Sequence, residues 1–415
     1  MKKINFEEEN YNIHMLQTDR FHRISFSVIF ERNIKEEDFA YSSLLINVLD
    51  ILAFKSIKEK KKKRLEIYSP NYELSIDFKG NHTLLFLKSF FIDEKYTEKG
   101  MNEKSVKYLL HLIYNESIIK NKISKEAFET AKAKTLNRLK SSPDNQEYYA
   151  LQELKSIQKI FSFKIPNTKR QIELIENISE DDIYNYYIDL LNNSRIEIFF
   201  VGNIDRGEVE KILSKNFNPL PRNIELKELY LKSQSEQNDV VKIEQTQKQQ
   251  SILFKSYYLD NLTDFEKMYV LPILHNTIGT NRGLLYDEIR SKNSLCYFIF
   301  SFDGKEINRF YIYTGINSKN YELVNHLIEE TLEKVKCNDF KDSFFINAKN
   351  LILTDLDTVF ENQSILTTFF QEEIILNKDS LEKQKSNYQQ VTKADVSALV
   401  KKLKPDVTFL LKGED

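Results

Sequence analysis

Short alternating stretches of hydrophobic and polar residues recur along the chain, and an amphipathic segment long enough for a helix follows each one. Residues 24–30 (ISFSVIF) have the period of a strand and lead into a helical pattern over residues 36–54. Residues 251–255 lead in the same way into a helical pattern over residues 265–278, with Thr263 and Asp264 at its start as caps. The pattern predicts the same strand–helix unit near the start of both halves.

Each half continues with two alternating stretches that fit a hairpin and two long amphipathic stretches that fit helices. In the first half these are residues 72–78, 83–89, 106–119 and 125–139. In the second half they are residues 296–302, 310–315, 321–337 and 342–355. Ala131-Lys132 and Ala348-Lys349 occupy matching places in the last helix of each set. This order indicates an internal repeat.

Both halves also end alike, with a capped helix and then a strand. Residues 178–183 (ISEDDI) correspond to residues 391–396 (VTKADV), and residues 199–203 (FFVGN) correspond to residues 410–414 (LLKGE). Long helices together with hairpin-forming strands are typical of α+β folds. We therefore predict an α+β protein of two similar halves, each a mainly antiparallel sheet with long helices packed on one face.

A polar stretch that includes residues 233–239 (SQSEQND) separates the two copies and has the composition of a linker. The sequence therefore predicts a first domain over residues 1–220, a linker region over residues 221–250 and a second domain over residues 251–415.

Composition narrows the expected location and partners. Sixty Lys and Arg balance 62 Asp and Glu, so no overall charge favours nucleic acid or an anionic membrane. The two cysteines, Cys296 and Cys337, have neither disulfide-framework nor zinc-ribbon spacing. The N-terminus (MKKINFEEEN) lacks the apolar stretch of a signal peptide, and no run reaches the ~18 apolar residues of a membrane span. We expect a cytoplasmic protein that binds neither nucleic acid nor membranes.

The sequence offers little catalytic chemistry. None of the six histidines has a second histidine three to five residues away, so neither HExxH nor HxxEH is present. GxxxxGK[ST], GxGxxG and GxSxG are also absent, which leaves phosphate binding and serine catalysis without support. Residues 279–283 (GTNRG) fit a joint that ends a helix. The basic run over residues 55–64 fits a solvated connection after the first helix.

One segment carries a family resemblance. Residues 283–297 (GLLYDEIRSKNSLCY) resemble the second-half signature of the insulinase-like M16 zinc metallopeptidases, in which Leu-[FY]-x-x-[IV]-Arg precedes a Leu-x-Tyr that enters a strand. Residues 65–77 (LEIYSPNYELSID) are similar to the corresponding stretch of that family's first half. The resemblance covers essentially the whole chain, and it implies two halves that face each other like a clam shell.

The resemblance also implies what this chain lacks. An active M16 chain carries HxxEH on its first long helix and a glutamate further along, and these hold zinc with the motif glutamate as general base. Here residues 40–50 (AYSSLLINVLD) contain neither His nor Glu. We therefore expect no metal and no catalytic residue in this chain alone, and hence no hydrolysis without a partner.

The sequence does contain residues at two other positions that contact the substrate in this family. In the family, an arginine and a tyrosine seven residues later reach the bound peptide beside the zinc, and the matching positions are Arg290 and Tyr297. A guanidinium and a phenol suit this role because both can donate to a carbonyl oxygen as negative charge develops on it. The resemblance makes them candidate substrate-binding residues. Residue chemistry alone leaves open a salt-bridged arginine and a core tyrosine.

Within the family, the pattern is similar to the non-catalytic member of bacterial two-subunit pairs, which work in ribosomal-peptide maturation and related pathways. This implies a heterodimer with an HxxEH-bearing M16 subunit that holds the zinc, and a peptide substrate whose leader is removed. A homodimer and a free-standing peptide-binding or scaffold protein remain alternatives. An enzyme with unrecognised chemistry is a third reading, which the missing motifs disfavour.

Overall fold

The computed structural model describes residues 1–54, 56–114, 116–121, 123–219, 224–231 and 240–414. Parts of the predicted linker region 221–250, and residue 55 of the basic run, lie outside these residues. The chain forms two compact units, which are described separately. Unit 1 comprises Met1–Lys140, Lys169–Leu229 and Phe360–Asn377, and unit 2 comprises Ser141–Thr168, Tyr230–Val359 and Lys378–Asp415.

Unit 1 is built on a six-stranded sheet with the order β1-β2-β6-β3-β5-β4. Its strands are β1 (Lys2–Glu7), β2 (Asn12–Gln17), β3 (Arg23–Asn33), β4 (Asn71–Lys79), β5 (His82–Ile92) and β6 (Arg195–Gly202). All neighbouring strands are antiparallel except β2 and β6, which are parallel.

Unit 2 is built on a five-stranded sheet with the order β7-β11-β8-β10-β9. Its strands are β7 (Val240–Gln245), β8 (Ser251–Leu259), β9 (Cys296–Gly304), β10 (Arg309–Ile316) and β11 (Leu403–Lys412). Only β7 and β11 are parallel. Without β1, the two sheets match strand for strand and direction for direction, so the predicted repeat and the mainly antiparallel sheets are confirmed.

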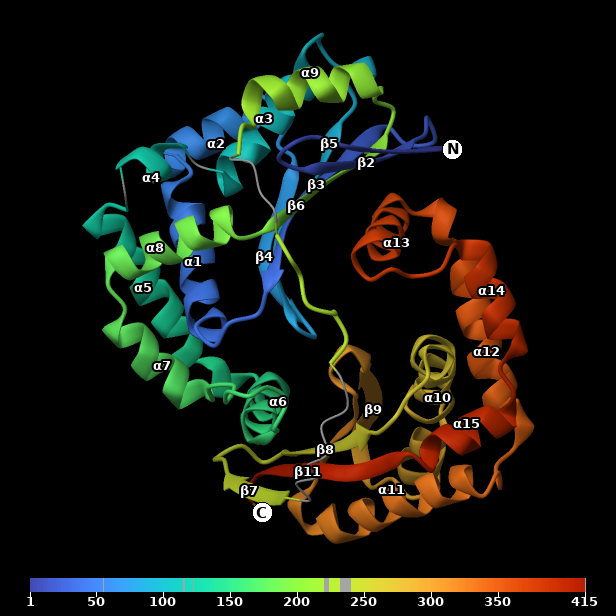
Figure 1. The fold of residues 1–415 in the computed structure, drawn as a ribbon. Coiled ribbons are helices and arrows are strands. Elements are labelled where there is room, and N and C mark those ends of the chain that lie inside the picture. The colour runs from blue at the N-terminus through green and yellow to red at the C-terminus, as the bar shows by residue number, and fades with distance from the viewer. Residues whose placement is uncertain (55, 115, 122, 220–223, 232–239, 415) are drawn as a thin grey trace. The chain divides into compact units, whose positions relative to one another are not determined.

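Among the described residues, six helices of the first half recur in the same order in the second half, and three have no α-helical counterpart there (Figure 1). The first half contains α1 (Asp38–Leu52), α2 (Ile57–Leu65), α3 (Met101–Ile113), α4 (Glu116–Asn121), α5 (Lys125–Lys140), α6 (Gln146–Ile157), α7 (Thr168–Asn177), α8 (Glu180–Asn192) and α9 (Arg206–Asn216). The second half contains α10 (Leu271–Ile278), α11 (Tyr321–Lys336), α12 (Asp342–Asp357), α13 (Gln363–Ile375), α14 (Leu381–Gln390) and α15 (Lys393–Val400).

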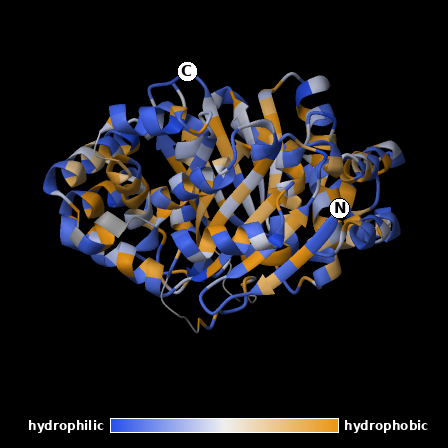
Figure 2. Ribbon diagram, turned by 90° about the horizontal axis from the view of Figure 1, so that it is seen from above, coloured by the Kyte–Doolittle hydropathy of each residue, from blue (hydrophilic) through white to orange (hydrophobic). Residues whose placement is uncertain are grey.

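Alternation along the strands places the apolar side chains under the helices. Phe26, Val28 and Phe30 of β3 are fully buried in one core with residues of α1, α3 and α8. Figure 2 shows the sheet strands largely hydrophobic and many outer helical turns hydrophilic. Burial of this apolar face is what holds the helices against the sheet.

One pair of lysines shows how closely the two halves match. Lys132 Nζ donates to the carbonyl oxygens of Glu176 and Ile178, both at 2.9 Å. Lys349 Nζ donates to the carbonyl oxygens of Gln389 and Val391, at 2.5 and 2.9 Å. Both lysines thus bind carbonyls at the end of one helix, directly before the capping box that starts the next. The capping box is Ser179 with Asp182 in the first half and Thr392 with Asp395 in the second.

Two helices depart from a simple division into halves. By order, α6 follows α5 as α13 follows α12, so they are equivalent in the repeat. Yet α6 belongs to unit 2, where Ala150 and Leu154 pack against β8 and β11, and α13 belongs to unit 1. There Phe370 contacts Phe199, whose side chain points away from the main core. Each sheet thus carries, on its second face, one helix from the other half of the sequence.

Two predicted helices differ in detail. The pattern over residues 106–119 is two helices, since α3 ends where Tyr114 leaves helical geometry and packs its ring on Phe217. The pattern over residues 265–278 is the π-helical turn η3 (Glu266–Val270) followed by α10. Pro272 lies in the first turn of α10 and has no N–H to donate, which favours the shifted bonding before it.

Residues 57–65, which include most of the basic run, form α2, a helix that is capped by Ser56 and has no buried residue, so this part of the predicted connection is solvent-exposed. Among the described residues no single helix is long and apolar enough to cross a membrane, and only α1 and α2 together, bent by 73°, pass that test of length and composition.

Candidate functional site

The first long helix, α1, contains neither His nor Glu, so it cannot carry HxxEH. Asn47, Asp50 and Ile51 have the one-four-five spacing of that motif. Asn47 Nδ2 donates to Thr135 Oγ1 of α5 at 2.8 Å. Thr135 in turn donates to the carbonyl oxygen of Ala131 at 2.8 Å. The first of these positions is therefore occupied by a hydrogen-bonded contact between two helices.

Asp50 is likewise bound within the unit. Its Oδ1 accepts from Lys60 Nζ of α2 at 2.5 Å and from the Tyr72 hydroxyl of β4 at 3.1 Å. Burial, and then the charge of Asp50, raises the pKa of Tyr72, so the phenol stays protonated and donates. In the part of the chain that the structure describes, no three His, Cys, Asp or Glu residues are placed to hold a metal ion.

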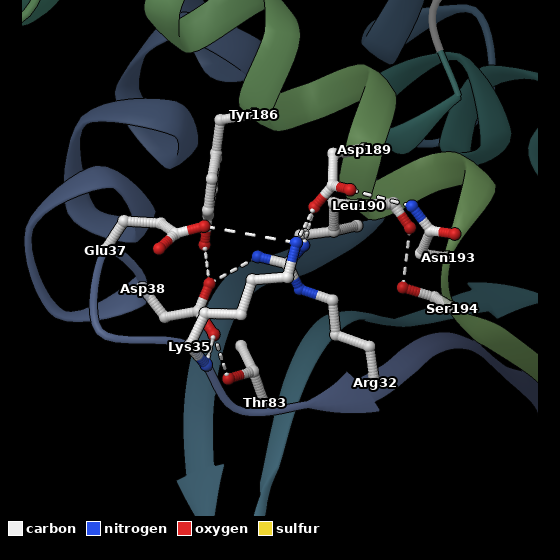
Figure 3. A network of polar contacts seen from close by, with 10 residues as sticks. All are labelled: Arg32, Lys35, Glu37, Asp38, Thr83, Tyr186, Asp189, Leu190, Asn193 and Ser194. Atoms are coloured by element: carbon white, nitrogen blue, oxygen red, sulfur yellow. Dashed lines mark hydrogen bonds and ion pairs between the residues drawn. The ribbon is translucent and has the colours of Figure 1, made fainter. Parts of the chain in front are cut away.

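The start of α1 carries a network of buried charges (Figure 3). Arg32 of β3 donates through Nη2 to Asp38 Oδ1 and through Nη1 to Asp189 Oδ2 of α8. The hydroxyl of Tyr186 donates to Asp38 Oδ1 at 2.6 Å, and its ring lies 4.9 Å from the Arg32 guanidinium. Arg32 and Asp38 are 2% and 0% exposed, so this ion pair is almost free of water.

Asp38 is saturated with donors. Its second oxygen, Oδ2, accepts from the Lys35 backbone N–H at 2.8 Å and from Thr83 Oγ1 at 2.6 Å. Burial alone would lower the pKa of Arg32, but Asp38 outweighs it and raises that pKa. The network therefore fixes where α1 begins relative to β3 and α8, and it presents no free nucleophile.

The predicted pair Arg290 and Tyr297 lies at the junction between η4 (Tyr286–Ser291) and β9. Arg290 Nη1 donates to the carbonyl oxygen of Cys296 at 2.6 Å, directly before Tyr297 in the chain. Among the described residues Arg290 forms no ion pair, and Tyr297 is 59% exposed. The alternative of a salt-bridged arginine and a core tyrosine is therefore wrong, while the substrate-binding role stays a prediction.

The local backbone explains this placement. η4 is a wide π-helical turn, in which Lys292 N–H donates to the carbonyl of Asp287 at 3.0 Å. Ser294 then adopts a left-handed conformation (φ 54°), and Leu295 N–H donates back to the carbonyl of Ile289 at 3.0 Å. This reversal sends the chain into β9 and leaves the Tyr297 side chain facing outward.

Each sheet has an open strand beside these positions. β4 is the outer strand next to β5, and its Tyr72 binds Asp50. β9 is the outer strand next to β10 and begins one residue before Tyr297. Outer strands present unpaired N–H and C=O groups, which can accept an added peptide strand.

Sequence reasoning missed the Arg32 network. An acidic residue at the start of a helix, such as Asp38, is a recognisable signal on its own. Nothing in the sequence pairs it with residues of α8 about 150 positions later, because that pairing depends on how the helices pack on the sheet.

Comparisons with known proteins agree with this fold. Residues 177–352 match the family described as "Peptidase M16 inactive domain". The chain is similar to a protein of Bacillus subtilis (strain 168) named "Probable inactive metalloprotease YmfF", with 21% identity over 97% of this chain and 96% of that one.

Two solved structures show the same architecture. A conserved protein from Enterococcus faecalis V583 superposes with a TM-score of 0.87 at 18% identity, over 99% of both chains. A peptidase M16 inactive domain from Pseudomonas fluorescens superposes with a TM-score of 0.76 at 14% identity, over 100% of this chain and 98% of that one. At these identities the structural likeness speaks for the fold alone.

Proposed function

Because the chain belongs to the M16 peptidase family and lacks its HxxEH motif, we propose that it is the non-catalytic subunit of a heteromeric zinc peptidase. In this proposal it binds and positions a peptide, and an M16 partner that bears HxxEH supplies the zinc. The class of substrate we propose is a peptide whose leader is removed during maturation of a ribosomally made product.

The contrast between α1 and the η4–β9 junction carries this proposal. At the HxxEH-spaced positions of α1, Asn47 and Asp50 are engaged by neighbouring side chains and cannot take up a metal without breaking those contacts. At the junction, Tyr297 remains exposed and Arg290 is held beside it. An exposed phenol beside an arginine, in a chain without HxxEH, suits a subunit that assists catalysis performed elsewhere.

The open strands favour a peptide as the substrate. An extended peptide that pairs with an outer strand gains main-chain hydrogen bonds that do not depend on its sequence. The phenol of Tyr297, at the start of the outer strand β9, would then donate to a peptide carbonyl. Donors of this kind matter most when the carbonyl oxygen becomes negatively charged during hydrolysis.

The test uses the complex with an HxxEH-bearing M16 chain from the same genome. Tyr297→Phe is the sharper variant, because it removes one exposed hydroxyl and leaves the fold untouched. We expect kcat to fall roughly 10²-fold while subunit association is unchanged. Arg290→Ala should also lower kcat, with folding checked because Arg290 anchors the Cys296 carbonyl.

Tyr148→Phe is the matched control, since Tyr148 is 47% exposed on α6 in the same unit. It should leave turnover unchanged. Two results together would show that the pair is structural and the chain a scaffold. The first is unchanged turnover in Tyr297→Phe, as in Tyr148→Phe, and the second is full activity in a correctly folded Arg290→Ala variant.

A further inference from the structure

α6 and α13, the two helices that lie on a sheet of the other half, bind their sheets through different kinds of side chain. They are equivalent in the repeat, and each has three residues spaced four apart on the side that faces its sheet. These residues are Gln146, Ala150 and Leu154 in α6, and Gln363, Thr367 and Gln371 in α13. The two contacts can therefore be compared position by position.

The first position anchors both helices in the same way. Gln146 Nε2 donates to the carbonyl oxygen of Gln250, directly before β8, at 3.0 Å. Gln363 Nε2 donates to the carbonyl oxygen of Arg23, the first residue of β3, at 2.6 Å. Because β3 and β8 are equivalent strands, the two helices begin at the same place on their sheets.

The next two positions differ in polarity. Ala150 and Leu154 of α6 are fully buried in an apolar cluster with residues of β8 and β11. The same positions of α13 hold Thr367 and Gln371, which are buried as well. The free energy gained from the hydrophobic effect is roughly proportional to the apolar area removed from water. At these positions α6 therefore gains more from docking than α13 does.

The strand under α13 is polar too. Ser25 and Ser27 alternate along β3 with the residues of the main core, so both point to the second face of the sheet, where they are buried. Ser25 lies opposite Val201 and Ser27 opposite Phe199 in β6. α13 contacts both of these β6 residues, through a hydrogen bond to the Val201 carbonyl and a ring contact with Phe199. The two serines therefore lie under α13.

Several polar groups at this contact have no partner. Among the described residues, the hydroxyl oxygens of Ser25, Ser27 and Thr367 and the Nε2 atom of Gln371 are buried without a hydrogen bond. An unsatisfied buried polar group costs free energy, and this cost disappears when the group reaches water. Release of α13 therefore offsets part of its own cost. Release of α6 would expose apolar side chains at the matching positions.

The other contacts of α13 do not make up this difference. Lys88 Nζ donates to Thr368 Oγ1 at 2.9 Å on the exposed side of the helix. Lys3 Nζ lies 2.6 Å from Glu373 Oε2, and the lysine side chain is 52% exposed. Exposed polar pairs of this kind contribute little to stability. The ring of Phe370, which is buried against Phe199, supplies apolar contact near the end of the helix.

We propose that α13 docks reversibly on unit 1 and leaves the second face of its sheet in a local opening, while α6 stays bound to the sheet of unit 2. The chain connections allow this, because the segment Phe360–Asn377 is joined to unit 2 at both ends and contributes no strand to the sheet of unit 1. Release uncovers Ser25 and Ser27 together with the second face of β6. The proposal does not depend on a partner subunit.

Hydrogen exchange of the full chain, followed by mass spectrometry, tests the release. A helix of 13 residues is marginal in water without packing, so the amide hydrogens of α13 exchange once it leaves the sheet. Their protection factors should be at least roughly tenfold lower than those of α6, also at denaturant concentrations well below the unfolding transition. Equal protection of the two helices would overturn the proposal.

Thr367→Val combined with Gln371→Leu tests the cause, because it gives α13 apolar residues of similar size at the two positions. The protection factors of α13 should rise at least roughly tenfold, while those of α6 stay unchanged. Thr368→Val is the matched control, since it makes the same change one residue later, on the exposed side of α13, and should not raise protection. Unchanged protection of α13 in the double variant would contradict the proposal.

Ser25→Ala combined with Ser27→Ala tests the sheet side of the contact and leaves the helix sequence unaltered. It removes two unsatisfied hydroxyl groups from under α13, so the protection factors of α13 should rise here as well. Circular dichroism and the urea midpoint check that each variant is folded. Protection of α13 that falls or stays the same in this folded variant would show that the buried hydroxyls do not govern its release, which would also overturn the proposal.

Discussion

The buried pair of Arg32 and Asp38 should be among the most sensitive positions in unit 1. Removal of one partner from a buried ion pair costs about 3–5 kcal/mol, because the other charge is left uncompensated in a dry environment. In Arg32→Met, Asp38 keeps three neutral donors, the hydroxyls of Tyr186 and Thr83 and the N–H of Lys35. The loss in the free energy of unfolding of this variant should therefore be near the lower end of that range, about 3 kcal/mol.

Asp38→Asn should cost more. Each oxygen of Asp38 accepts from one N–H donor and one hydroxyl, so an amide NH₂ group in either orientation would face an N–H, of Arg32 or of the Lys35 backbone, that cannot accept from it. Arg32 would also lose its most buried partner and keep only Asp189, whose side chain is 32% exposed. We expect a loss near about 5 kcal/mol.

Urea unfolding followed by far-UV circular dichroism measures both variants. With a slope of about 2 kcal/mol per M, losses of about 3–5 kcal/mol move the midpoint down by about 1.5–2.5 M. Arg170→Met is the control, because its pair with Glu173 is solvent-exposed and should change stability by less than about 1 kcal/mol.

The double variant isolates the pair itself. Arg32→Met together with Asp38→Asn should cost less than the sum of the single losses by at least about 1 kcal/mol. Single variants within about 1 kcal/mol of the parent chain, or losses in the double variant that simply add, would show that Arg32 and Asp38 are not a strongly coupled buried pair.

Three further outcomes follow from the structure. Lys132→Met and Lys349→Met should each lower the free energy of unfolding, measured with urea, of the unit that contains the substitution by about 1.5–3 kcal/mol. Each variant leaves two carbonyl oxygens at the end of a helix without their charged donor. Burial alone would raise the pKa of Glu31, but a histidine and an arginine outweigh burial and lower that pKa. The stabilisation from Glu31 is therefore present above about pH 4.3 and is lost as the pH drops further. Unfolding followed between neutral and acid pH should show a less steep loss of stability in Glu31→Gln than in the parent chain. Gly279→Ala should unfold at a markedly lower urea concentration, because its Cβ would lie 1.8 Å from Ser301 Oγ and 2.5 Å from the Ser301 backbone nitrogen.

The repeat was predictable because short-range sequence patterns determine the elements that recur. Strand alternation, the capping residues Ser179 and Thr392, and the two lysines after Ala131 and Ala348 all act within one or two neighbouring elements. Each signal occurs twice in the same order, so the two copies support each other. This is why two similar halves with mainly antiparallel sheets could be predicted from the sequence.

The exchange of α6 and α13 could not be predicted in this way. Both helices have apolar positions, but periodicity does not say which sheet buries them. Ala150 and Leu154 pack on a sheet whose strands begin about 100 residues later.

The candidate pair was found from a resemblance and not from physical pattern. Arg290 and Tyr297 are seven residues apart, a spacing without meaning for a regular helix or strand. Their proximity depends on the π-helical turn η4 and the left-handed Ser294, which the hydrophobic pattern does not encode.

We propose that this chain assists a zinc-bearing partner and does not bind the catalytic zinc itself. The most direct measurement is peptide turnover, together with zinc content, for this chain alone, the HxxEH-bearing partner alone, and the two combined. We expect cleavage by the combination at least roughly 10²-fold faster than by the partner alone, with one zinc per pair held by the partner. Equal turnover by the partner alone, or a stoichiometric zinc and cleavage by this chain alone, would contradict the proposed non-catalytic role.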